Sequence, residues 1–212
     1  MLTDSFKDSP ESVSPGVDED LFDARFAATR REGVPVEKTT ALWRENQKKA
    51  ECAVNQQVLG TGGASAAIGT RLQVDGNPSQ DLQLTIDPNW RGMISNKGFG
   101  SSTLQFQTLA TRGSAPLFPD LGSSSVLDRR EHVDLSRGAS LTPKVVSGSN
   151  SVDLVVLSSD LSDGDIVRVT VGADVTATMT NGLGQSRADA ASNVEGNYDG
   201  RIFFGSVQVS WR

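Results

Sequence analysis

The chain has 212 residues, of which 36% are hydrophobic and 22% are charged, and its formal net charge is −6 at pH 7. A single Cys and a single His exclude an internal disulfide framework and a zinc cage of four Cys and His ligands. We expect no nucleic-acid partner because the chain is acidic, and no membrane partner or signal peptide because the first twenty residues are acidic and no apolar run is long enough to span a bilayer. A soluble protein made in the cytosol is therefore the expectation.

The composition changes near Gly60. Residues 1–59 hold six of the eight Glu and four of the six Lys, which favour helices over strands. The rest of the chain holds most of the Gly, and its acidic residues are mainly Asp, a residue typical of turns. We therefore predict two parts joined by a Gly linker at 60–63, with a β domain over 64–212.

The first part begins with an extended polar tail, residues 1–16, which has too few apolar residues to order itself. A helical arm over 17–59 follows. One helix is predicted over 18–31, because Asp18 can cap it and its charges run from acidic to basic in the order that the helix dipole favours. A second helix is predicted over 37–58, between Pro35 and Gly60.

Both predicted helices carry apolar side chains that two short helices cannot bury alone. We expect these side chains to dock onto neighbouring subunits. The predicted partner-binding residues are Leu21, Phe22, Phe26, Leu42 and Trp43. Cys52 lies among small apolar residues of the second helix, so it is interpreted as a packing residue.

The second part alternates apolar and polar residues with a period of two, as in Leu82-Gln83-Leu84 and Val207-Gln208-Val209. We count about eight such strands, separated by turn signals such as Asn181-Gly182. No helical period interrupts them. The pattern predicts an antiparallel β-sandwich or jelly roll, with two long connections at about 110–143 and 180–200 that serve as functional loops or contact arms.

Catalytic chemistry has little support in the sequence. His132 lies in a mixed-charge run, Asp128 to Asp134, that could supply a base with an orienting carboxylate. A solvated or intersubunit ion-pair patch explains the same residues better, and no Ser lies in a G-x-S-x-G motif. We expect no enzyme and no cofactor.

A metal site has one weak candidate. Asp160, Asp163 and Asp165 surround Gly164 and could offer carboxylate oxygens to calcium. Their spacing does not match a calcium-binding loop, and an Asp-rich hairpin turn explains the same residues. We therefore predict no metal.

Two predicted loops, 88–100 and 180–200, carry aromatic residues beside polar ones. Trp90, Arg91 and Tyr198 form the mixture that stacks on sugars and hydrogen-bonds to them. A loop Trp also often plugs the end of a sandwich. A carbohydrate-binding or receptor-binding module is the alternative function.

The combination of tail, arm and β domain favours a non-enzymatic structural protein that assembles with copies of itself. Terminal arms that lace β-sandwich subunits together recur in virus and phage particles, an analogy at the level of fold. Residues 1–59 hold 11 acidic and 8 basic residues, which argues against contact with a packaged genome. We therefore expect a virion component, such as a decoration, cement, vertex or head-to-tail joining protein, whose partners are itself and other particle subunits.

Overall fold

The computed structural model describes residues 11–13, 19–21, 25–32, 38–44, 49–112, 126–138, 140–191 and 200–212, with side chains from residue 49 onward except at 140–141 and 181–183. In these residues the protein is mainly β, as predicted. The strands form one connected sheet of twelve, and the helical structure in the described ranges is a single 3-10 turn, η3 (Ser158–Asp160).

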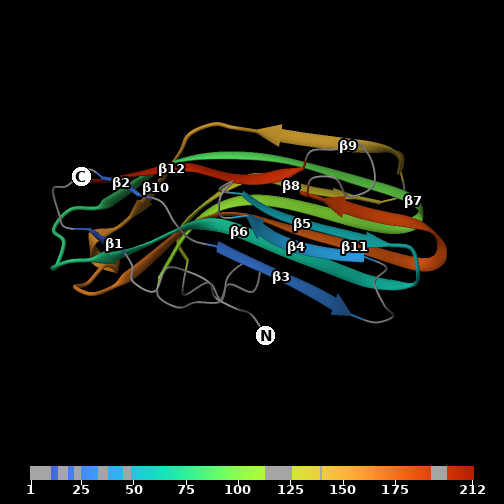
Figure 1. Ribbon diagram of the computed structural model, residues 1–212, viewed down its shortest axis with the longest axis horizontal. Coiled ribbons are helices and arrows are strands. Elements are labelled where there is room, and N and C mark those ends of the chain that lie inside the picture. The colour runs from blue at the N-terminus through green and yellow to red at the C-terminus, as the bar shows by residue number, and fades with distance from the viewer. Residues whose placement is uncertain are drawn as a thin grey trace.

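The strands follow one another along the chain with few intervening elements (Figure 1). Their bounds are β1 (Glu11–Val13), β2 (Glu19–Leu21), β3 (Arg25–Glu32), β4 (Lys38–Arg44), β5 (Lys49–Gln56), β6 (Gly60–Val74), β7 (Leu82–Arg112), β8 (Val126–Arg137), β9 (Ser140–Gly148), β10 (Val152–Val156), β11 (Ile166–Asp189) and β12 (Arg201–Trp211).

Two of these strands, β7 and β11, are long enough to fold back on themselves. The first and second arms of β7, 82–97 and 100–112, meet face to face, because the ring centroids of Trp90 and Phe106 lie 5.0 Å apart. β11 reverses between Met179 and Gly184, where its register with β7 shifts. Figure 1 shows this reversal of β11 at the right-hand end of the molecule.

The pairings form two rows that face each other. One row runs β3, β6, the first arm of β11, the second arm of β7 and β8. The other row runs β4, β5, the second arm of β11, the first arm of β7 and β9. Beyond the last residue of β11, β12 continues that side of the row and pairs with the first arm of β7. β10 pairs with the opposite side of this arm, the side on which β9 also lies.

The core lies between the two rows. Alternate residues of the first arm of β11 are fully buried there, from Val167 to Ala177. Cys52 on β5 reaches across from the other row, with its Sγ 3.6 Å from the carbonyl oxygen of Ala173. Cys52 is thus a buried packing residue, as predicted, although it lies on a strand rather than a helix.

The reversals of β7 and β11 depend on glycine. Gly98 and Gly184 have φ angles of 90° and 134°, in the range that L side chains rarely adopt. These two glycines are paired in register, and a Cβ on Gly184 would overlap the carbonyl oxygen of Lys97. The two strands can therefore reverse side by side only where both side chains are absent.

The two predicted helices are wrong. Residues 19–21, 25–32, 38–44 and 49–56 form strands, although Glu and Lys are frequent there. The reason is clearest in β5, where alternate residues, Ala50, Cys52 and Val54, are buried in the core. Strand pairing and burial outweigh the helix propensity of the intervening residues.

The predicted Gly linker and separate arm are also replaced by strands. Residues 60–63 begin β6 and pair with β11 on one side and β3 on the other. Ala64 and Ala66, the next residues of β6 that face inward, are fully buried between the rows. Small side chains are therefore suited to this part of β6. The N-terminal strands thus belong to the same sheet as the β domain. Within the predicted tail, 11–13 form β1, and the rest lies outside the described residues.

Much of the predicted loops also belongs to strands. Residues 88–100 lie within β7, and 180–189 lie within β11. The connection predicted at 110–143 contains β8 and the start of β9. Their turn-forming Gly and Asn residues misled the prediction, because here such residues lie where long strands reverse.

A matched series of Gly→Ala variants tests the reversal. Gly138→Ala should change the free energy of unfolding little, because its Cβ meets nothing within 4 Å and its φ is ordinary. Gly164→Ala has open space but a φ of 81° and should cost about 1–2 kcal/mol. Gly184→Ala adds the overlap with Lys97 and should cost about 3 kcal/mol or more. Urea unfolding measures all three, and equal costs at Gly164 and Gly184 would contradict the packed reversal.

Candidate functional site

Four of the five predicted partner-binding residues lie on the N-terminal strands. Leu21 is in β2, Phe26 in β3, and Leu42 and Trp43 in β4, in each case where side chains are not described. Phe22 lies outside the described residues. Their role in docking therefore stays a prediction, and it now applies to strands of the sheet rather than to helix faces.

Trp90 is part of the packing between the two rows. Its ring stacks on Phe106 and lies 5.9 Å from the ring of His132. On the β9 side, a Cβ on Gly148 would overlap the indole, so the backbone of β9 runs directly against it. These contacts favour the interpretation that Trp90 plugs the fold rather than stacks on a sugar.

Of the other predicted ligand residues, the structure describes Arg91, which is not brought together with Trp90. Arg91 follows it in β7, so strand alternation directs the Arg91 side chain to the opposite face. Arg91 is paired in register with Arg201 of β12. Tyr198 lies outside the described residues, so its role in binding stays a prediction.

His132 occupies an irregular position in β8. Val133 pairs with Phe106 and Glu131 with Gln107, so His132 is the extra residue of a β-bulge. Its Nε2 lies 2.7 Å from the Oγ1 of Thr108, a fully buried residue. Burial lowers the pKa of His132 below its usual 6.5. The His132 ring is thus held between the Thr108 hydroxyl and the Trp90 indole.

Two of the three candidate metal ligands accept hydrogen bonds from backbone amides. Asp163 Oδ1 accepts a hydrogen bond from the Gly76 amide at 2.7 Å, and Asp165 Oδ2 accepts one from the Ser162 amide at 2.8 Å. The amide of Asp160 closes the 3-10 turn. The described ranges contain no group of three or more His, Cys, Asp or Glu residues that could hold a metal ion.

A buried ion pair lies where β11 meets β5. Arg187 Nη2 lies 2.6 Å from Asp189 Oδ2, and the Ala191 amide donates to Asp189 Oδ1 at 2.7 Å. Burial raises the pKa of the Asp189 carboxyl, although the hydrogen bonds from Arg187 and Ala191 oppose that change. On β5, Lys49 Nζ pairs with Glu51 Oε1 at 2.8 Å. These two ion pairs lie beside the end of β11, and this position fits a structural role.

The reversals carry exposed apolar side chains. Val58 and Leu59, in the turn between β5 and β6, are 41% and 52% exposed, and Phe99, where β7 reverses, is 67% exposed. We call these three residues the apolar end. Gln56 Nε2 donates to the Val58 carbonyl at 2.8 Å, and Thr180 Oγ1 donates to the Phe99 carbonyl at 3.0 Å. The first turn is therefore braced by the end of its own strand, β5, and the second is held by the neighbouring strand β11.

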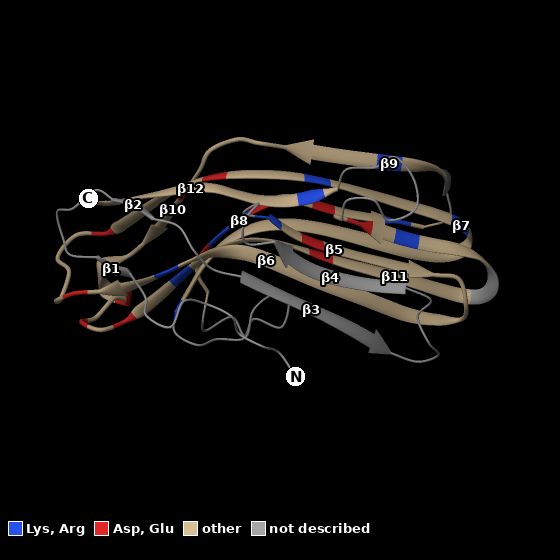
Figure 2. Cartoon of the chain, viewed as in Figure 1, with Lys and Arg blue, Asp and Glu red and all other residues tan. Residues whose placement is uncertain are grey.

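A polar network inside the fold supports the apolar end. Asn96 Nδ2 donates to the carbonyl oxygens of Arg137 and Gly138, at 2.6 and 2.9 Å, and Ser186 Oγ donates to Asn96 Oδ1 at 2.8 Å. These bonds tie β7, β8 and β11 together close to their reversals. The opposite end differs in character, because acidic residues gather in its turns, at the left in Figure 2.

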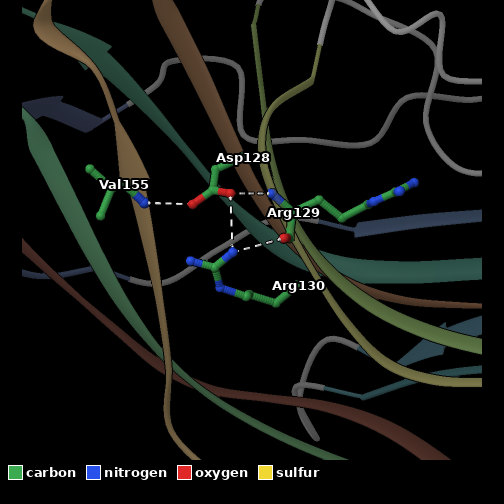
Figure 3. A network of polar contacts seen from close by, with 4 residues as sticks. All are labelled: Asp128, Arg129, Arg130 and Val155. Carbon is green, nitrogen blue, oxygen red and sulfur yellow. Dashed lines mark hydrogen bonds and ion pairs between the residues drawn. The ribbon is translucent and has the colours of Figure 1, made fainter.

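A second set of exposed apolar side chains is spread over β9, β10 and the residue that follows β10. Val145, Val155 and Leu157 are 47%, 40% and 51% exposed. Beside Val155, Asp128 of β8 accepts a hydrogen bond from the backbone of β10, as Figure 3 shows. Sequence reasoning missed both sets. A signal was present only at the apolar end, where Phe99 stands between two glycines and Leu59 precedes one.

No protein family and no curated protein sequence matches this chain. In the described part of the chain, no helix is long and apolar enough to cross a membrane.

The burial of His132 predicts a pH dependence of stability. Near pH 6.5 the unfolded chain takes up a proton that the folded protein, with its lower pKa, does not bind. The contribution of His132 is therefore fully present above pH 6.5 and is lost progressively as the pH falls from there through the lower pKa of the folded protein. A tenfold difference in proton affinity between the two states is worth about 1.4 kcal/mol.

Urea unfolding of the natural chain and of His132→Gln at pH 8 and pH 5 checks this. The Gln variant keeps a partner for Thr108 and cannot be protonated, so it should lose less stability between the two pH values. Asp189, whose raised pKa acts in the opposite direction, is common to both proteins. Equal losses in both would show that His132 does not cause the dependence.

Proposed function

We propose that this chain is a non-enzymatic subunit that assembles with copies of itself. The observation that carries the proposal is the apolar end, where Val58, Leu59 and Phe99 are exposed on hydrogen-bonded turns. Large apolar side chains held out into water favour an interface, because their burial is the main driving force for association.

The strand order supports a more specific architecture, the jelly roll. The rows β5–β11–β7–β9 and β6–β11–β7–β8 each contain four antiparallel positions. Each position in one row is joined through a reversal to its counterpart in the other, which is the arrangement of an eight-stranded jelly roll. β3 and β4 extend the two rows by one strand each. Jelly rolls recur in viral shells and in lectins.

The placement of this subunit in a virion is part of the same proposal. It rests on the analogy of fold and on the acidic N-terminal region, which argues for a decoration, cement, vertex or joining role rather than genome packaging. The carbohydrate-binding alternative loses support at Trp90, because its ring is engaged by Phe106 and His132.

The double variant Leu59→Ser/Phe99→Ser tests the role of the apolar end. Each apolar side chain buried in an interface contributes about 1.5–3 kcal/mol, so self-association should weaken at least about tenfold. Light scattering over a range of concentrations measures the mass. Gln73→Ser/Gln208→Ser, at two exposed polar positions, is the matched control and should behave like the natural chain. A natural chain that is monomeric throughout, or a double variant of unchanged mass, would overturn the proposal.

A further inference from the structure

β8 is held to the fold less firmly than the strand beside it. In the described part of the chain it pairs with one strand, the second arm of β7, and two register shifts interrupt that pairing. Every residue of β8 is at least partly exposed, whereas the second arm of β7 is buried from Phe106 to Thr111. β8 therefore has fewer buried side chains than its neighbour to keep it in place.

Contacts at three points along β8 join it to the strands of the other row. Near its start, Asp128 Oδ2 accepts a hydrogen bond from the Val155 amide of β10 (Figure 3). Near its end, the Asn96 side chain on the first arm of β7 donates to two backbone carbonyl oxygens. Between these two points, the His132 ring lies against Trp90 of the same arm of β7.

The middle contact belongs to an aromatic stack. Trp90 stacks on both His132 and Phe106, with ring centroids 5.9 and 5.0 Å apart. The backbone of β9 lies directly against the same indole, because a Cβ on Gly148 would overlap it. This one stack therefore joins β8, both arms of β7 and β9.

The hydrogen bond of His132 also depends on the charge of its ring. The Nε2 atom lies 2.7 Å from the Oγ1 of Thr108, which is fully buried. A neutral imidazole can accept the hydroxyl hydrogen at this nitrogen, but a protonated ring cannot, because both of its nitrogens then carry hydrogens. Protonation therefore removes an acceptor from a buried hydroxyl and places a positive charge within the stack.

The groups in contact with the ring do not compensate for that charge. Those on β7 are a hydroxyl and an indole, which are both uncharged. Each charged residue beside this position on β7, β8 and β9 is exposed or directed to the opposite face; these are Arg91, Arg130, Glu131, Asp134 and Lys144. Burial accordingly lowers the pKa of His132.

We propose that protonation of His132 detaches β8 from the first arm of β7, so that the side of the fold between β8 and β9 opens in acid. The ring is only partly buried, and β8 lies at the end of its row, so an outward movement of β8 hydrates the charge without displacing another described strand. The opened side exposes the Trp90 indole. None of these residues belongs to the apolar end, so the inference does not rest on the proposed function.

Linkage gives the direction and the upper limit of the effect. In the open form the ring is in water and has its ordinary pKa of 6.5, whereas burial lowers the pKa in the closed form. The closed form is therefore favoured most above pH 6.5, and the open fraction rises as the pH falls below that value. One such group can raise the opening equilibrium by at most about thirtyfold at pH 5.

Hydrogen exchange measured by mass spectrometry at pH 8 and pH 5 tests the inference. After correction for the intrinsic exchange rate at each pH, peptides of β8 should lose protection severalfold at pH 5, while peptides of β6 should not. His132→Gln keeps a partner for Thr108 and cannot be protonated, so its β8 should stay protected at both pH values.

Three results of this experiment would overturn the inference. The first is unchanged protection of β8 in the natural chain at pH 5. The second is an equal loss in His132→Gln, because the acid effect would then come from another group. The third is an equal loss in β6, because the whole fold would then be opening rather than one side of it.

Acrylamide quenching of tryptophan fluorescence gives an independent readout of the opened side. The chain has three Trp residues, so the difference between the natural chain and Trp90→Phe isolates the signal of Trp90. Acrylamide should quench this signal more strongly at pH 5 than at pH 8, and the increase should be absent in the His132→Gln background. Equal quenching at both pH values in the natural chain would contradict the opening.

Discussion

β11 is the strand on which the rest of the structure depends. Its first arm bonds to β6 on one side and β7 on the other, and its second arm bonds to β5 and β7. Because both arms belong to one strand, any change in the register of one arm displaces the other. The reversal of β11 therefore fixes the relation between the two rows, and it also fixes which side chains of β7 face the core.

The reversals also determine which surfaces are available for binding. Side chains within the arms alternate between core and surface, but a residue at a reversal cannot pack against either row, so Phe99 and Leu59 remain exposed. A hydrogen bond from Gln56 braces the first turn locally, and one from Thr180 holds the second turn to β11. A rigid turn loses little conformational entropy on binding, which makes an apolar residue there more effective than one on a loose loop.

The sequence allowed the β-rich character of 64–212 to be predicted, because alternation over β6, β10 and β12 depends only on which face is buried. The N-terminal strands were mispredicted since composition was weighted above the alternation of Ala50, Cys52 and Val54. Local sequence patterns do not identify long strands that reverse, because the glycines at a reversal resemble the glycines of a loop. The contacts of Trp90 with His132, and of Asp128 with β10, join residues far apart in the chain, which no local pattern reveals.

The central place of β11 has a consequence for the newly made chain. β5 and β6 leave the ribosome early, yet their shared partner begins at Ile166 and is followed by β12, which ends at Trp211. For most of its synthesis the chain therefore carries strands whose edges have no permanent partner. Folding has to wait for distant segments to meet, which is slow for β topologies.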